Sequence, residues 1–165
     1  MKDAHFWIKN LKLQPHPEGG YFKENYRSHE VIAKIALPNR FSGDRVFSTG
    51  IYFLLNKNDY SAFHVINQDE MWHFYEGSSV TIHIIDKDGT YSTLSLGRDI
   101  TNGESHQVIV KAGCFFAAEN NNKELYSLSG CTVAPGFDFA DFKMPGRNKL
   151  IKMFPQHIKI INMFT

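Results

Sequence analysis

Cysteine, long apolar runs and an excess of charge of one sign are all scarce in this chain of 165 residues. The two cysteines, Cys114 and Cys131, are too few for a disulfide framework and favour buried, reduced thiols in a cytoplasmic protein. Because 18 Lys and Arg residues balance 17 Asp and Glu residues, we expect neither nucleic acid nor an acidic membrane as a partner. No apolar run approaches the roughly 20 residues that cross a bilayer. At the start, Asp3, His5 and Lys9 interrupt the apolar region that a signal peptide would need.

Aromatic residues are plentiful, and they fall in short segments that alternate like β-strands. They make up 14% of the chain, with 14 Phe, which suits a β-sandwich or barrel better than a helical bundle. The length favours a single domain, residues 1–165. Turn signals such as "DKDGT" and "ENNNK" separate the strand-like runs, which are predicted at residues 30–37, 45–55, 60–66, 70–75, 79–86, 91–96, 106–110, 114–118 and 124–133.

Helical patterns occur only towards the two ends. Residues 2–13 predict a short amphipathic helix, and residues 148–164 predict one or two helices broken at Pro155. Closely spaced strands with no helix between them indicate an antiparallel sandwich or barrel, not βαβ units. We therefore predict an all-β jelly-roll barrel with short N- and C-terminal helices.

A histidine and a glutamate stand out in the stretch "SAFHVINQDEMWHFYEG", residues 61–77. Since side chains alternate along a strand, Glu70, Trp72 and Phe74 share one face of their strand. If this face and the face that carries His64 both point inward, the barrel holds an imidazole and a carboxylate between aromatic walls. A buried carboxylate is costly unless it has a partner or a function.

These residues resemble the first motif of the cupin superfamily: Gly, five residues, His-any-His, three or four residues, Glu, six residues, Gly. His64, Glu70 and Gly77 stand at matching positions, whereas Ile66 replaces the second histidine. The second cupin motif matches more loosely, with Phe116 at the position of its histidine. The resemblance implies a double-stranded β-helix, the cupin jelly roll.

One uncharacterised cupin branch is more closely similar. It is marked by "PHPEGGYF", "IYFLL", "DEMWHFYEG" and "VAPGFDF", which stand here at residues 15–22, 51–55, 69–77 and 133–139. Proteins of that branch are similar in fold to dTDP-4-keto-6-deoxyglucose 3,5-epimerases and to seed storage proteins. They tend to form dimers, so the resemblance implies a homodimer.

A metal centre is the first chemistry that the resemblance raises. Typical cupins bind Fe, Mn, Ni or Zn through three histidines and a glutamate, and only His64 and Glu70 remain here. Catalytic metal sites generally offer at least three protein ligands. We therefore expect no cofactor. A divalent metal is the alternative, with a third ligand from His83, His106 or Glu18.

Metal-free acid–base catalysis is the second reading. The epimerases of similar fold use a histidine base that a carboxylate orients, and a tyrosine acid. By analogy, His64 is the base, Glu70 or Asp69 orients it, and Tyr52 or Tyr126 is the acid. An imidazole suits this role because its pKa lies close to neutrality.

A third reading is a binding module without turnover. Trp72, Phe74, Phe116 and Tyr52 would line the barrel mouth and hold a small, carbohydrate-like ligand, although aromatic residues on strands also fit an ordinary core. The residues expected to contact a ligand are Glu18, Tyr21, Trp72, Phe74, His83, Phe116 and Tyr126.

The stretch "PHPEGGYF" predicts a shaped loop that runs into a strand. Its prolines stiffen the approach, and Gly19 and Gly20 allow dihedral angles that other residues avoid. Structure alone does not account for Glu18, Tyr21 and Arg27, a charged and aromatic set around this turn. We predict that the segment covers the barrel mouth, with Glu18 and Tyr21 near the ligand, and that in a dimer it comes from the partner subunit.

Overall fold

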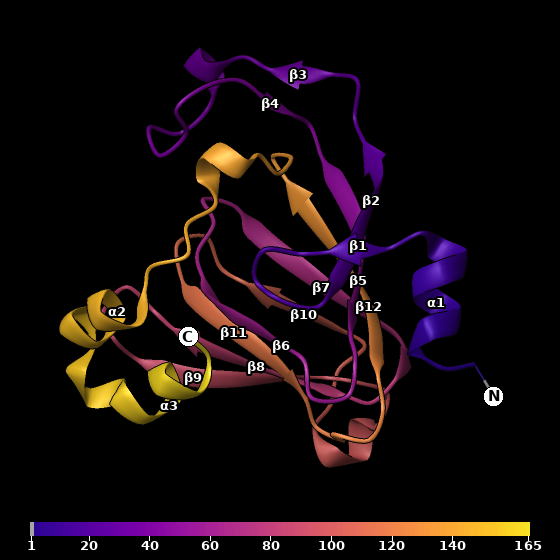
Figure 1. Ribbon diagram of the computed structural model, residues 1–165. Helices are drawn as coiled ribbons and strands as arrows, with labels where there is room; N and C mark the ends of the chain where they lie inside the picture. The colour runs from indigo at the N-terminus through magenta and orange to yellow at the C-terminus, as the bar shows by residue number, and fades with distance from the viewer. Residues whose placement is uncertain (1) are drawn as a thin grey trace.

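Two antiparallel β-sheets face each other in the computed structural model, which describes residues 2–165 (Figure 1). The larger sheet has six strands in the order β1-β2-β5-β12-β7-β10, and the smaller has four in the order β6-β11-β8-β9. The strands of the larger sheet are β1 (Gln14–Pro15), β2 (Tyr21–Arg27), β5 (Thr49–Leu55), β12 (Ser127–Ala134), β7 (Asp69–Gly77) and β10 (Gln107–Val110). Those of the smaller sheet are β6 (Tyr60–His64), β11 (Phe115–Asn120), β8 (Val80–Ile85) and β9 (Tyr91–Leu96).

A two-stranded arm projects beyond the sheets, at the top of Figure 1. It comprises β3 (Val31–Ile32), the 3-10 turn η1 (Lys34–Ala36) and β4 (Arg45–Val46). The remaining elements are α1 (Ala4–Leu11), η2 (Ile100–Asn102), η3 (Phe139–Asp141), α2 (Arg147–Met153), η4 (Pro155–His157) and α3 (Ile158–Met163). Within residues 2–165, no helix is long and apolar enough to span a membrane.

Each sheet has an inner and an outer apolar face, because side chains alternate along its strands. Between the sheets lies one core cluster, made by Phe53, Leu55, Trp72, Val80, Ile82, Ile84 and Phe116 among others. The C-terminal helices α2 and α3 cover the outer face of the four-stranded sheet, and α1 covers the outer face of the six-stranded sheet (Figure 1). Each strand therefore divides its residues between a barrel interior and a helix-covered exterior.

The β-rich architecture and the terminal helices confirm the sequence prediction. Most predicted strands are present within a few residues, and the C-terminal helices break at Pro155 as expected. The prediction of a single strand over 30–37 is wrong. That segment pairs only at β3 and then turns through η1, where the Asp44 carboxylate accepts a hydrogen bond from the Lys34 backbone N–H at 2.7 Å.

Candidate active site

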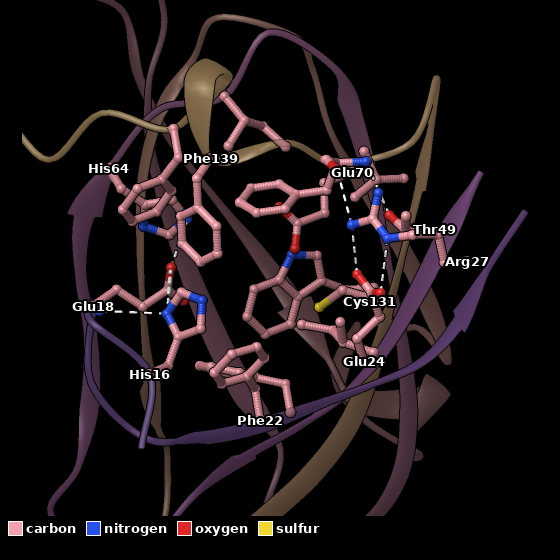
Figure 2. Close-up of a pocket in the computed structure, with 17 residues that line it drawn as sticks. His16, Glu18, Phe22, Glu24, Arg27, Thr49, His64, Glu70, Cys131 and Phe139 are labelled. Atoms are coloured by element: carbon pink, nitrogen blue, oxygen red, sulfur yellow. Dashed lines mark hydrogen bonds and ion pairs between the residues drawn. The ribbon is translucent and has the colours of Figure 1, made fainter. Parts of the chain in front are cut away.

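A cavity of about 80 Å³ lies at the end of the barrel interior beneath the arm, and its lining is mostly aromatic. That volume holds several water molecules or a small organic group. Figure 2 shows the labelled side chains around it, with aromatic rings between two polar groups. The polar lining residues are His16, Glu18, Glu24, Arg27, Thr49, His64, Glu70 and Cys131, and the apolar ones are Phe22, Ile51, Phe53, Ile66, Trp72, Val133, Phe137, Phe139 and Phe142.

The alternation of side chains along the strands determines which residues form the walls of the cavity. On β5, Thr49, Ile51 and Phe53 line the cavity, and on β7, Glu70 and Trp72 do so. His64 comes from the opposite sheet, at the last position of β6. His64 and Glu70 therefore enter the cavity from facing walls, as the sequence pattern required for a shared interior.

The loop between β1 and β2 supplies two further polar residues, His16 and Glu18. Gly19 and Gly20, both at positive φ, give this loop its course. A Cβ at Gly19 would lie 2.1 Å from the backbone oxygen of Tyr60, so the loop packs directly against β6. This close approach brings Glu18 to the imidazole of His64.

A segment after β12 covers the cavity with Phe137, Phe139 and Phe142. The segment is fixed by a buried ion pair in which the Arg45 guanidinium donates two 2.7 Å hydrogen bonds to the Asp141 carboxylate. Gln68 and Asn67 also donate to Asp141, at 2.7 and 3.0 Å. From the loop at residues 15–22, which was expected to cover the cavity, Glu18 lines the cavity as predicted, whereas Tyr21 packs in the cluster beneath α1.

His64 is held in one neutral tautomer. Its Nδ1 lies 2.8 Å from the backbone oxygen of Ala62, and a carbonyl can only accept, so Nδ1 carries the proton. Burial lowers the pKa of His64, while the charge of Glu70 acts in the opposite direction. The other nitrogen, Nε2, is therefore left with a lone pair for accepting a proton.

The carboxyl group of Glu18 lies between two imidazoles. Its Oε2 is 3.3 Å from Nε2 of His64 and 3.4 Å from Nδ1 of His16. His16 Nδ1 also accepts a hydrogen bond from the Glu18 backbone N–H at 3.3 Å, so this nitrogen too presents a lone pair. Two lone pairs facing one carboxyl oxygen call for a proton on that oxygen. In agreement, burial raises the pKa of Glu18 to about 7.

Glu70 is the second buried carboxyl group of the cavity. Burial raises its pKa to about 7, and the charge of Glu18 raises it further whereas the charge of His64 lowers it. Its neighbour Cys131 has a pKa raised well above the ordinary value, mainly by burial, so the thiol stays protonated. Burial lowers the pKa of His16 as well as that of His64, so near neutral pH the interior holds two carboxyl groups that exchange protons readily and two neutral imidazoles.

The carboxylate in contact with His64 is Glu18, not the Glu70 or Asp69 that the sequence suggested. No His64–Glu70 ion pair forms within 4.0 Å, although the charges interact. Asp69 is exposed and instead accepts hydrogen bonds from Lys111 Nζ and from the Ala112 backbone N–H. The loop that brings Glu18 to β6 could not be placed from strand periodicity.

The three predicted tyrosines lie outside the cavity, on the outer face of the six-stranded sheet. Tyr21, Tyr52 and Tyr126 pack in the cluster beneath α1. Each stands one residue out of phase with a residue that faces inward; Phe22 and Phe53, for example, line the cavity beside Tyr21 and Tyr52. The predicted roles of Tyr52 and Tyr126 as the acid therefore have no geometric support.

The other expected ligand contacts divide between the core and the outer surface. Trp72 lines the cavity, whereas Phe74 packs against the central core outside it. Phe116 is fully buried with its ring 4.0 Å from the His64 ring, which it supports without lining the cavity. His83 lies on the outer face of β8, where Tyr91 and Glu119 bind its two nitrogens.

Sequence reasoning missed the charged pair at the cavity rim. Arg27 donates to both carboxylate oxygens of Glu24, at 2.8 and 2.7 Å, and to the backbone oxygen of Phe137 at 3.2 Å. A register shift between Glu24 and Tyr26 turns Arg27 towards the cavity. From the sequence, Arg27 stood out only because it lies near the glycine turn. A single sequence gives no clear signal of a β-bulge, so the direction of the Arg27 side chain could not be predicted.

Sequence comparison assigns the family. The pattern of the Cupin superfamily (DUF985) matches residues 5–145. The chain belongs to that family. This cupin is 33% identical over 143 residues to the uncharacterized protein YML079W of Saccharomyces cerevisiae, a match that spans 81% of this chain and 71% of the yeast protein.

Two solved structures resemble this cupin over essentially its full length. Protein SO0799 from Shewanella oneidensis has a TM-score of 0.89 and 38% identity, with 100% of this chain and 98% of that chain covered. A hypothetical protein from Leishmania major has a TM-score of 0.88 and 32% identity, with 99% of each chain covered. Oxalate decarboxylase from Bacillus subtilis has a TM-score of 0.56 and 12% identity, and the match covers 92% of this chain and 36% of that chain. At this identity the match shows a similar fold and nothing more.

The donor set of this cupin does not fit a divalent metal. Two positions of the cupin ligand pattern are held by Ile66 and Phe116, which have no donor atom. Of the three candidates for a third ligand, His83 lies on the outer face and His106 is exposed, whereas Glu18 does line the cavity, 3.3 Å from His64 Nε2. In the described part of the chain, no group of three or more His, Cys, Asp or Glu side chains is arranged to hold a metal ion.

Proposed function

We propose that this cupin binds a small carbohydrate-like molecule in its cavity and exchanges a proton on the carbon next to a carbonyl group. This is the chemistry of a metal-independent epimerase or isomerase. One observation carries the proposal: a neutral imidazole, His64, presents its Nε2 lone pair in an aromatic cavity and faces a carboxyl group from the opposite sheet. The sequence motifs also imply a similarity in fold to dTDP-4-keto-6-deoxyglucose 3,5-epimerases, which is an analogy of fold and agrees with this class of reaction.

The reaction starts with proton abstraction by His64. Nε2 accepts the proton from the carbon, and the electron pair of the C–H bond moves into an enolate whose charge lies on the carbonyl oxygen. Protonation of Nε2 makes the imidazole cationic. The pKa of Glu18 is about 7, so in the molecules in which this group is already ionised its carboxylate, 3.3 Å from Nε2, stabilises the cation without any further proton transfer.

Reprotonation from the opposite wall completes the step. Glu70 has a pKa of about 7, so near neutrality a large share of the molecules carry the proton there. When Glu70 returns a proton to the opposite face of the carbon, the enolate becomes a ketone of inverted configuration. His64 has gained one proton and Glu70 has lost one, and exchange with solvent restores both groups.

The experiment is solvent deuterium exchange. Keto-sugars incubated with the protein in deuterium oxide should acquire deuterium at the carbon beside the carbonyl, detected by mass spectrometry. His64→Ala should abolish the exchange while the variant keeps the circular dichroism spectrum of the wild type. Equal exchange rates for the wild type and His64→Ala would refute the proposed chemistry.

A binding module without turnover is the second candidate. The aromatic walls and few convergent polar groups of the cavity suit ligand retention alone. Thermal-shift measurements with sugars, nucleotide sugars and nucleotides identify the class of ligand, since a ligand of the native state raises the melting temperature. Stabilisation by a keto-sugar without deuterium exchange favours this candidate.

We also propose that two copies of this cupin associate through the arm. Its exposed apolar side chains include Val31, Ile35 and Phe47, and Ile35 is 97% exposed. Several exposed apolar side chains on one small element suit an association surface. Light scattering during gel filtration should give a dimer for the wild type and a monomer for Ile35→Asp.

A further inference from the structure

One buried hydrogen-bond donor of the cavity is left without an acceptor. Trp72 is 1% exposed and lines the cavity, yet its indole Nε1–H has no hydrogen-bond partner among residues 2–165. The indole nitrogen can only donate, and a buried donor without an acceptor costs about 1–3 kcal/mol. The other tryptophan, Trp7, shows the usual arrangement, because its Nε1–H donates to the Tyr126 hydroxyl at 2.9 Å.

The surroundings of Trp72 define which acceptor is suitable. Glu70 precedes it by two residues on the same inner face of β7, and Glu18 lies across the cavity. An anionic ligand group would meet two carboxyl groups that are partly ionised near neutral pH. Arg27, the cation of the lining, is held at the rim by Glu24. A neutral oxygen is therefore the acceptor that the inner end of the cavity favours.

We propose that Trp72 Nε1–H is the donor that binds the carbonyl oxygen of the ligand, while Glu70 binds the hydroxyl group on the neighbouring carbon, the carbon that it reprotonates. The ligand class is then a neutral hydroxycarbonyl compound, with its carbonyl and a neighbouring hydroxyl placed between Trp72 and Glu70. The inference deepens the proposed function and relies on the same cavity as the ligand site.

The same hydrogen bond assists proton abstraction. As His64 removes the proton from carbon, negative charge grows on the carbonyl oxygen, and a fixed N–H donor in a mostly aromatic cavity stabilises that charge more than it stabilises the starting ketone. The indole keeps its proton throughout, so the atom balance of the reaction is unchanged. Trp72 thereby acts on both ligand choice and rate.

The test uses the two indole N–H signals in proton–nitrogen NMR spectra of the wild-type protein. The protein contains two Trp residues, and Trp7 serves as the internal control. Titration with dihydroxyacetone, a neutral hydroxy ketone, should move the Trp72 signal downfield and leave the Trp7 signal in place. Titration with acetate, a small anion, should move neither.

A variant then separates the donor from the ring. Trp72→Phe keeps an aromatic side chain and removes the N–H, and it should bind dihydroxyacetone about tenfold more weakly. Trp7→Phe is the matched control and should bind as the wild type does. The NMR titration does not depend on either variant folding normally.

The outcomes distinguish this inference from the proposed function. If the Trp72 signal stays in place with dihydroxyacetone, or moves with acetate instead, the inference is wrong, even where deuterium exchange that depends on His64 persists. If the Trp72 signal moves but no exchange occurs, the donor assignment stands and the catalytic proposal fails. Absence of both responses overturns both.

Discussion

His64 and His83 form a natural comparison, because each is a buried histidine on the four-stranded sheet with a carboxyl group beside it. They are 3% and 7% exposed, and their Nε2 atoms lie 3.3 Å from Glu18 and 3.1 Å from Glu119. Burial lowers the pKa of both histidines. They differ in the face of the sheet that they occupy: His64 lines the cavity, and His83 lies beneath the C-terminal residues.

Both ring nitrogens of His83 and one face of its ring are in contact with other side chains. Its Nδ1 is 2.7 Å from the Tyr91 hydroxyl, its Nε2 contacts Glu119, and the ring of Phe164 stacks on it with centroids 4.8 Å apart. Lys123 also binds Glu119. In the cavity, by contrast, the Glu18 carboxyl opposite His64 shares its proton and an open volume adjoins both groups. A histidine–carboxyl pair therefore indicates chemistry here only where a cavity reaches it.

The largest expected effect comes from removing each imidazole in turn. His64→Asn should lower the rate of deuterium exchange by at least about a hundredfold, since a positioned base contributes roughly 10²–10⁴-fold. His83→Asn should leave the exchange rate within about twofold and lower the melting temperature, because it breaks buried hydrogen bonds. Mass spectrometry and differential scanning calorimetry measure the two effects.

The reverse pattern would contradict the comparison. A normal exchange rate in His64→Asn, or a large loss in His83→Asn, would place the chemistry on the outer face. Both variants are needed, because either alone leaves general destabilisation as the explanation.

The next effect concerns Glu18. Glu18→Gln retains an oxygen to accept the Ser61 hydroxyl hydrogen bond, 2.8 Å in the wild type, but its amide carries no negative charge to balance a charged His64. We expect the exchange rate to fall about tenfold, with the pKa of His64 lowered further by the loss of the carboxylate. Nitrogen NMR of the imidazole gives that pKa directly. Glu119→Gln is the matched control and should change neither quantity in His64.

Strand alternation allowed much of the fold and part of the site to be predicted from the sequence. The inward positions of His64, Glu70 and Trp72 follow from a period of two on short, regular strands. The cupin spacing added the prediction that His64, at the end of β6, faces the barrel interior together with Glu70. Both signals are local, so both survive in a single sequence.

The remaining site residues depend on features that are not local. Glu18 reaches His64 through a loop that packs on β6, and Arg27 faces the cavity because of a bulge in β2. The tyrosines were predicted to face inward, but they lie on the outer face of the sheet, one residue away from the inward positions. The sequence could not show that α1 covers the face of β5 that carries Tyr52. A helix on the outside makes both faces of a strand apolar, which removes the usual distinction between inside and outside.

Replacing Glu70 and replacing Glu119 should change the free energy of unfolding in opposite directions near neutral pH. Burial raises the pKa of Glu70 from 4.5 to about 7, so the unfolded chain releases this proton first and stability falls as the pH rises across that range. Glu70→Gln removes the penalty. It should be more stable than the wild type above pH 7, by something on the order of 3 kcal/mol, and should approach the wild type below pH 4.5.

Glu119 should behave in the other direction. Its pKa is lowered: burial acts to raise it, and the hydrogen bonds and charges of Lys123 and His83 outweigh burial. The carboxylate thus stabilises the fold above pH 4.5, and that contribution is lost as the pH falls. Glu119→Gln should be slightly less stable than the wild type near neutrality, since solvent screens part of the interaction. Urea unfolding at several pH values measures both, and curves of the same sign would contradict the assignment.

The smallest expected effect belongs to Tyr52, the residue that sequence analogy offered as the acid. Its ring lies in the cluster beneath α1, with the Tyr75 ring 6.1 Å away, and the sheet separates it from the cavity. Tyr52→Phe should therefore leave the rate of deuterium exchange within about twofold, because the hydroxyl is not in the cavity to give or take a proton. A tenfold loss would show that the outer face communicates with the site, and Glu70 would then no longer be the simplest acid. Retained activity would restrict the acid to the inner walls, where Glu70 is the carboxyl group opposite His64.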